Sequence, residues 1–187
     1  TLTVVEVGDG AVAVDPDQTT YVYGDVVTLT ATADLGWTFA EWTGDLTGST
    51  NPDTVTITGD TVVTAMFEQD EYTLDVFTEG QGTVTVDPDQ ATYHYGDVVT
   101  LTAEAETGWA FVEWSGDLTG AANPDALNIT GNTVVTATFK EEYTLTVNTV
   151  GDGSVAVDPD QTVFVSGTVV TLTATADPGW TFAGWTG

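Results

Sequence analysis

Three acidic triplets are the most promising groups for chemistry in this sequence. Each places two carboxylates on either side of a proline: Asp15 and Asp17, Asp87 and Asp89, and Asp158 and Asp160. Two carboxylates in a turn supply part of the roughly six to eight oxygen ligands that Ca²⁺ prefers. The spacing lacks the EF-hand register, and Asp-Pro-Asp fits an ordinary turn equally well. Calcium is therefore an alternative at these turns. A catalytic acid–base pair is disfavoured, because nothing in the sequence gives the two carboxylates different environments.

Side chains for nucleophilic or general-base catalysis are almost missing. The 187 residues contain no Cys, one His (His94) and one Lys (Lys140). A catalytic triad or a metal centre would need partners for His94, and the sequence does not supply them. We expect His94 to be an ordinary strand residue. The sequence therefore predicts no enzyme activity and no catalytic, cofactor-binding or metal-binding residues, with Ca²⁺ as the only cofactor left open.

Two features are compatible with carbohydrate. Asn128-Ile129-Thr130 is an N-glycosylation sequon, and Asn128 should face outward because its neighbours Leu127 and Ile129 face inward. Four tyrosines, which we expect to be exposed, offer rings for stacking on sugars, although cross-strand pairing is the simpler interpretation. They are Tyr21, Tyr23, Tyr93 and Tyr95.

Composition restricts the partners of this chain. Asp and Glu number 29 against one Lys and no Arg, giving a formal charge of −28. Nucleic acid and anionic membranes are poor partners, because almost no cation is present to meet them. At about 1 M salt the Debye length falls to about 3 Å, which screens the repulsion among carboxylates. We therefore expect a protein adapted to high salt, with a calcium-rich extracellular setting as the alternative. No apolar run is long enough to span a membrane, so no direct insertion is expected.

The largest apolar groups lie in one stretch that occurs three times. It runs from Gly36 to Gly48, returns from Gly108 to Gly120 and begins again at Gly179. All six tryptophans lie in these copies, and we interpret the rings as the structural core of small β modules rather than as a ligand platform. The predicted core residues are Trp37, Phe39, Trp42, Trp109, Phe111, Trp114, Trp180, Phe182 and Trp185.

The whole chain repeats with a period close to 70 residues. Gly24, Gly96 and Gly167 begin matching segments, which gives steps of 72 and 71 residues. We place the repeats at residues 1–70, 71–141 and 142–187, the last one truncated. Within each repeat, apolar residues alternate with polar ones between turns, which predicts short, mostly antiparallel strands in an all-β module. Short charged linkers predict modules arranged end to end.

The order Gly-x-Gly-x-Val-x-Val, Gly-x-Val-Val-Thr-Leu-Thr-Ala, Gly-Trp-x-Phe-x-x-Trp-x-Gly-Asp-Leu-x-Gly, Asn-Pro and Thr-Val-Val-Thr-Ala-x-Phe resembles the divergent internalin-type B-repeat. The match covers the first two repeats and the first two thirds of the third. This resemblance implies a β-grasp-like module strung in tandem on secreted or surface-anchored prokaryotic proteins. It implies an extracellular or cell-surface location, and the family carries no catalytic residues to transfer. The extreme acidity departs from common members and bears on habitat.

These observations favour a structural repeat region, such as a stalk, spacer or filament-forming segment, with copies of itself or other surface proteins as partners. The alternative is an adhesive module that recognises carbohydrate or a surface partner, with or without calcium. Thr1 falls inside a repeat, so we expect the sequence to be a window on a longer chain. The third repeat lacks the counterparts of Leu127 to Phe139, so its core should be open until following residues, or strands of another subunit, complete it.

Overall fold

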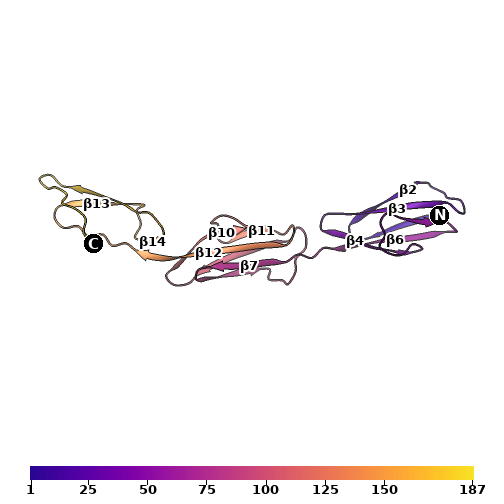
Figure 1. Ribbon diagram of the computed structural model, residues 1–187, viewed down its shortest axis with the longest axis horizontal. Coiled ribbons are helices and arrows are strands. Elements are labelled where there is room, and N and C mark those ends of the chain that lie inside the picture. Colours follow the sequence, from indigo (N-terminus) through magenta and orange to yellow (C-terminus); the bar gives the residue numbers. More distant parts are fainter. The chain divides into compact units, whose positions relative to one another are not determined.

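The computed structural model describes residues 1–187, and strands account for all of its regular structure (Figure 1). No helix is present, and so none that is long and apolar enough to cross a membrane. The chain divides into two compact units, each built from several segments. One contains Thr1–Leu74, Asp89–Val99 and Asn128–Thr133, and the other contains Asp75–Pro88, Thr100–Leu127 and Val134–Gly187.

The first repeat begins and ends in the same sheet. This sheet has the strand order β1-β6-β4, with β1 at Leu2–Val7, β6 at Thr61–Gln69 and β4 at Trp37–Gly44. β4 runs antiparallel to β6, whereas β1 runs parallel to β6 from the pair Leu2 and Thr61 to the pair Val7 and Met66. The sequence predicted mostly antiparallel strands, and this parallel pair is the exception in the repeat. Period-two alternation is the same in both pairings, so it does not distinguish them.

The second sheet of the first repeat has three antiparallel strands. Its order is β2-β3-β5, with β2 at Gly10–Asp15, β3 at Val26–Ala33 and β5 at Asp53–Thr56. Thr28, Thr30 and Thr32 of β3 face away from the core, while Val27, Leu29 and Ala31 are buried. The threonines alternate with the buried apolar residues, as a half-buried strand requires.

The two sheets enclose one hydrophobic core. Buried side chains from β3 and β5 meet those from β4 and β6, and Ile57 closes one end. The core consists of Val27, Leu29, Ala31, Trp42, Val55, Ile57, Val63, Ala65 and Phe67. The all-β module predicted from the sequence is thus confirmed, and the β-grasp-like unit implied by the resemblance consists here of strands alone.

The second repeat copies this arrangement strand for strand. Its pairings are β7 with β12, β10 with β12, and β11-β9-β8. The final strand, β12, is longer than its counterpart β6, because it continues through the linker as far as Thr144. The bounds are β7 Leu74–Glu79, β8 Gly82–Asp87, β9 Val98–Ala105, β10 Trp109–Gly116, β11 Asp125–Asn128 and β12 Thr133–Thr144.

The third repeat has only part of this fold. β13 (Gly153–Asp158) pairs with β15 (Thr171–Ala176), and β14 (Val163–Val165) pairs with the end of β12. An open apolar hollow of about 310 Å³ lies in this repeat, lined by Tyr143, Leu145, Phe164 and Leu172 among others. No strand after β15 takes the place of β11 or β12 in this repeat within residues 1–187.

Three of the predicted core residues are not buried within residues 1–187. Trp180, Phe182 and Trp185 are about half exposed, at 53%, 51% and 50%, and belong to no strand. They do not form a core within residues 1–187, because no strand equivalent to β6 covers them. Phe182 and Trp185 nevertheless contact each other, with ring centroids 5.0 Å apart.

Two glycines in the first turn explain the Gly-x-Gly motif. Gly8 has φ of +88°, and a Cβ on it would lie 2.4 Å from the Phe67 carbonyl oxygen and 2.8 Å from the Trp37 ring. A Cβ on Gly10 would lie 2.6 Å from the Phe67 ring. The turn therefore needs glycine because two aromatic rings lie directly on its backbone. Gly80 and Gly82 meet Trp109 and Phe139 in the same way.

We predict that Gly10→Ala destabilises the first repeat by about 1–3 kcal/mol, because the added methyl overpacks the buried Phe67 ring. Gly59→Ala is the matched control, since a Cβ there meets nothing within 4 Å and Gly59 has no positive φ. Thermal unfolding followed by calorimetry measures both variants. Equal stability of the two variants would show that the ring does not require glycine beneath it.

Candidate functional site

The repeated aromatic stretch of the first repeat lies on β4, where a β-bulge sets the direction of its rings. Phe39 pairs with Phe67, and Trp42 pairs with Ala65, although three positions separate Phe39 from Trp42 and only two separate their partners. A regular strand would send residues three apart to opposite faces. The bulge at Ala40 adds one residue and turns both rings toward the core. The spacing Phe-x-x-Trp is the sequence signal of this bulge.

The rings pack together in the same way in both complete repeats. Phe39 lies 4.9 Å from Trp42 and 5.9 Å from Phe67, measured between ring centroids. In the second repeat the matching distances from Phe111 are 4.8 Å to Trp114 and 5.8 Å to Phe139. These tilted and edge-to-face contacts are the favoured geometry for aromatic pairs. The rings thus contact one another rather than presenting a flat face to solvent.

Burial differs between the two tryptophans of each pair. Trp42 and Trp114 are 0% and 1% exposed, whereas Trp37 and Trp109 are half-buried over Gly8 and Gly80. The indole Nε1–H of Trp42 donates to the Thr50 carbonyl at 2.9 Å, and that of Trp114 donates to the Ala122 carbonyl at 2.8 Å. The most buried ring of each complete repeat therefore makes its packing contacts and its hydrogen bond inside its own module.

An asparagine amide extends the second sheet of each complete repeat. Asn51 Oδ1 accepts from Ala31 N–H at 2.9 Å, and Asn51 Nδ2–H donates to the Ala31 carbonyl at 2.8 Å. Asn123 makes the same pair of bonds to Ala103, both at 2.8 Å. The side chain thus replaces a neighbouring strand for one residue. The recurrence of Asn-Pro just before β5 and β11 is the sequence signal of this bridge.

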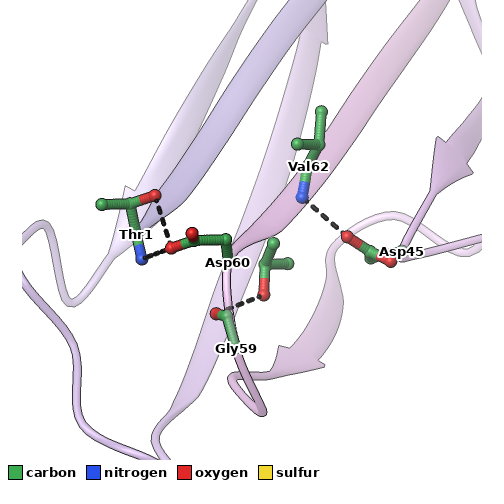
Figure 2. A network of polar contacts seen from close by, with 6 residues as sticks. Thr1, Asp45, Gly59, Asp60 and Val62 are labelled. Atoms are coloured by element: carbon green, nitrogen blue, oxygen red, sulfur yellow. Dashed lines mark hydrogen bonds and ion pairs between the residues drawn. The ribbon is translucent and has the colours of Figure 1, made fainter.

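Turn carboxylates accept backbone N–H groups in several places. Asp45 accepts from Val62 N–H at 2.7 Å (Figure 2). Its counterpart Asp117 accepts from Val134 N–H at 2.8 Å. Asp60 Oδ1 receives the Thr1 ammonium at 2.7 Å and the Thr1 hydroxyl at 3.0 Å (Figure 2). These two hydrogen bonds hold the pKa of the Asp60 carboxyl below its usual value, and the bond from the ammonium has the larger effect.

The three Asp-Pro-Asp triplets follow β2, β8 and β13, with their first Asp as the last strand residue. All six of their carboxylate residues are exposed. No group of three or more His, Cys, Asp or Glu side chains is arranged to hold a metal ion. The structure brings no further acidic ligand to these turns, and calcium binding stays an untested prediction.

His94 lies in a turn rather than in a strand. Its N–H donates to Asp97 Oδ2 at 2.8 Å, and Asp97 N–H donates back to the His94 carbonyl at 3.1 Å. The imidazole Nδ1 is 3.9 Å from Asp97 Oδ2. The prediction of a strand histidine was wrong in its location, because the Gly96-Asp97 pair closes a turn here.

The tyrosines expected at the surface fall into different environments. Tyr93 is 2% exposed, so the expectation that it faces solvent was wrong; its backbone pairs with Tyr72. Tyr21 is half-buried and donates to the Pro16 carbonyl at 2.9 Å. Tyr23 and Tyr95 remain accessible, at 83% and 40%.

Asn128 is the last residue of β11 and is exposed, between the buried Leu127 and Ile129. The side chain is thus accessible to solvent at the start of a turn. The corresponding residue of the first repeat, Thr56, is also an exposed strand end. N-glycosylation of Asn128 stays a prediction.

Comparison with known proteins agrees with this geometry. A family model described as the divergent InlB B-repeat domain matches residues 1–71, 72–142 and 143–187. No curated protein and no solved structure matches the chain. The family matches therefore cover the entire sequence as three tandem repeats.

We predict that Asn123→Asp destabilises the second repeat by about 1–3 kcal/mol, because the carboxylate cannot donate to the Ala103 carbonyl and repels it. Asn128→Asp is the control, since it adds the same charge at an exposed strand end of the same repeat. Urea unfolding compares the two variants in one buffer. If both variants lose equal stability, the amide bridge contributes nothing beyond charge.

Proposed function

The chain belongs to the divergent InlB B-repeat domain family, and on that premise we propose that it is a structural stalk, spacer or filament-forming segment. The family is associated with repeat regions of surface proteins, and repeat domains of this kind are structural or binding modules. We propose further that the parent protein is secreted or surface-anchored, prokaryotic and without enzyme activity in this region.

The observation that carries this proposal is the use made of the repeated residues. The large buried rings, the sheet-extending asparagines and the closely packed glycines that the two complete repeats share all act inside their own module. Trp42 and Trp114 fill the cores, Asn51 and Asn123 extend a sheet, and Gly10 and Gly82 admit a phenylalanine ring.

The charge distribution supports adaptation to concentrated salt. The exposed surface carries almost all of the 29 acidic residues, and the single Lys side chain, Lys140, is also exposed. Few carboxylates have a cationic partner: Asp60 pairs with the Thr1 ammonium at 2.7 Å, and the His94 imidazole lies 3.9 Å from Asp97. Mutual repulsion among the remaining carboxylates opposes the compact state and is weakened by salt.

One observation favours a second candidate function, an adhesive module. Tyr23 and Phe77 are 83% and 56% exposed, and aromatic rings in such positions can stack on carbohydrate. We keep carbohydrate, and calcium-assisted contact with a surface partner, as this alternative. Asn128, as the acceptor of a glycan, is compatible with either function.

For the high-salt proposal, we predict that the unfolding temperature rises by at least about 5 °C between 0.1 M and 2 M KCl, which corresponds to roughly 1 kcal/mol for a domain of this size. Replacing Glu6, Glu41 and Glu68 together by Gln should reduce this rise, because fewer carboxylates then repel one another. All three are exposed, and no hydrogen bond or ion pair holds their side chains. An unfolding temperature that is independent of salt in the unaltered chain would contradict the proposal.

To separate the two candidate functions, we predict that a glycan array retains none of the labelled protein, with or without Ca²⁺. Binding that is lost in Tyr23→Ala, but kept in the control Val169→Ala, would establish the adhesive module instead. Val169 is 85% exposed and has no ring, so it controls for loss of exposed apolar surface. Tyr93 is unsuitable for this test because it is buried.

A further inference from the structure

The outer face of the second sheet carries almost no charge in the first repeat. Val27, Leu29 and Val55 point into the core, so the residues that alternate with them point to solvent. Asp15, the last residue of β2, is the one acidic residue at an outward position. We call this surface, with its equivalents in the other repeats, the threonine face. In the first repeat it consists of Ala11 and Ala13 of β2, Val26, Thr28, Thr30 and Thr32 of β3, and Thr54 and Thr56 of β5.

The other two repeats have the same face. In the second repeat its residues are Thr83 and Thr85 of β8, Val98, Thr100 and Thr102 of β9, and Ala126 and Asn128 of β11. In the third repeat they are Ser154 and Ala156 of β13, and Thr171, Thr173 and Thr175 of β15. The outward acidic residues are Glu104 and the strand-end residues Asp87 and Asp158. A chain with 29 acidic residues therefore repeats an almost uncharged face three times.

Neighbouring repeats do not cover the threonine face. The second repeat has one repeat before it and one after it, and yet Val98 is 56% exposed, as Val26 is in the first repeat. Thr83 and Thr85 of the second repeat are exposed as well. The exposure of this face therefore does not depend on the place of a repeat in the chain.

The other outer face of each complete repeat has a different character. Glu41 of β4 and Glu113 of β10 are exposed in the middle of their strands, each next to a buried tryptophan. Away from the first and last residues of strands, acidic residues lie on the sheet that contains β4 or β10, and Glu104 is the exception. The two faces of one module thus differ in charge, although both meet solvent.

The chemistry of the threonine face indicates what can pack on it. A hydroxyl both donates and accepts hydrogen bonds, so a surface of threonines is complementary to a second surface of the same kind. The face offers no aromatic ring to a sugar and no cation to an anionic partner. A cationic partner would be attracted to the acidic turns instead. Another copy of this chain can approach here without placing many carboxylates opposite each other.

We propose that the threonine face of one copy of this chain packs against the threonine face of a second copy. This inference rests on the proposed structural role and names its partner: a second copy, bound through the same surface on both chains. Such a contact is isologous and closes as a pair. The small side chains allow the two sheets to approach to the usual distance of about 10 Å between packed sheets.

The size of the face sets the strength of this pairing. Three strands about 4.8 Å apart and about six residues long cover roughly 300 Å². Two such faces bury roughly 600 Å² together, which is less than the roughly 1,200 Å² at the lower limit of a stable interface. Two repeats of one chain, engaged at once, reach this limit. We therefore expect an association that needs more than one repeat, because linked contacts strengthen each other.

Charge sets the condition for this pairing. Each copy carries a formal charge of −28, so two copies repel each other even when the surfaces in contact are nearly neutral. High ionic strength screens this repulsion. We therefore expect self-association at 2 M KCl and a monomer at 0.1 M KCl.

Sedimentation velocity over a range of concentrations tests the proposal with the full chain at 2 M KCl. The variant Thr30→Glu with Thr102→Glu places a carboxylate on the central strand of the threonine face in both complete repeats. Like charges then face each other across the contact, and the dissociation constant should rise about tenfold or more. The protein is used without glycans, because a glycan on Asn128 would lie on this face.

The matched control is Thr64→Glu with Thr136→Glu. These two threonines lie on β6 and β12, the central strands of the other sheets, and are half-buried like Thr30 and Thr102. The control adds the same charge to the same repeats on the opposite face, so association should stay unchanged. Circular dichroism and thermal unfolding check that both double variants fold.

Mixing two variants gives a second readout. Thr30→Lys with Thr102→Lys should also prevent self-association, whereas an equimolar mixture of this chain with the Thr30→Glu, Thr102→Glu chain should associate. Opposite charges then meet across the contact, and a glutamate that merely distorted β3 or β9 would not be rescued in this way. A mixture that uses Thr64→Lys with Thr136→Lys instead should stay monomeric.

Three results would overturn the proposal. They are a chain that stays monomeric at every concentration in 2 M KCl, association that survives the glutamates at Thr30 and Thr102, and no association in the Glu and Lys mixture. None of them would contradict the structural role, because a stalk or spacer does not require pairing of chains. Glycan binding by the unaltered chain, in contrast, would remove the proposed function itself.

Discussion

Each complete repeat depends on enclosing one indole between two small sheets. Trp42 and Trp114 are fully buried and donate their only polar hydrogen to a carbonyl within the same repeat. A module of about 70 residues buries little surface, so loss of one large aromatic side chain, about 3–5 kcal/mol, removes much of its stability. The β-bulge in the Trp strand, the two glycines of the first turn and the parallel pairing of β1 with β6 all contribute to this enclosure. The bulge turns the ring inward, the glycines admit its neighbours, and β6 lies between the first strand and the Trp strand.

Acidic residues have two different roles in this fold. Some are acceptors for backbone N–H groups in turns, as Asp25, Asp45 and Asp97 are, and these hydrogen bonds need no cation. Others lie on the surface without such a bond and contribute only charge. The hydrogen bonds of the turns are therefore complete although the chain has only one Lys and no Arg. The unpaired surface carboxylates repel one another, which opposes folding, and this repulsion weakens as the ionic strength rises.

The contacts beside the first linker differ from those beside the second, and we call each set of contacts a joint. The first joint has Tyr95 on Gly36 and Thr38 bound to Asp70. At the second joint the equivalent residues are Ser166 and Ala110, and no side chain reaches Gly108. There β12 instead continues through the linker and pairs with β14. The backbone pairing beside the linker is present at both joints, as a single bridge between Tyr72 and Tyr93 at the first and as the β12–β14 pair at the second.

The sequence by itself determined the repeat period, the all-β class, the short strands and the family, because alternation, turn residues and spacing are local properties. It also indicated that the third repeat would be open. Tertiary structure alone decided which strands are neighbours: the parallel pairing of β1 with β6 joins residues about 60 positions apart, and alternation does not specify a partner. It also decided that Tyr93 is fully buried while Tyr21, at the same position in the first repeat, is half-buried. Burial depends on what packs against a side chain, and Tyr93 has Tyr72 of the linker paired beside it.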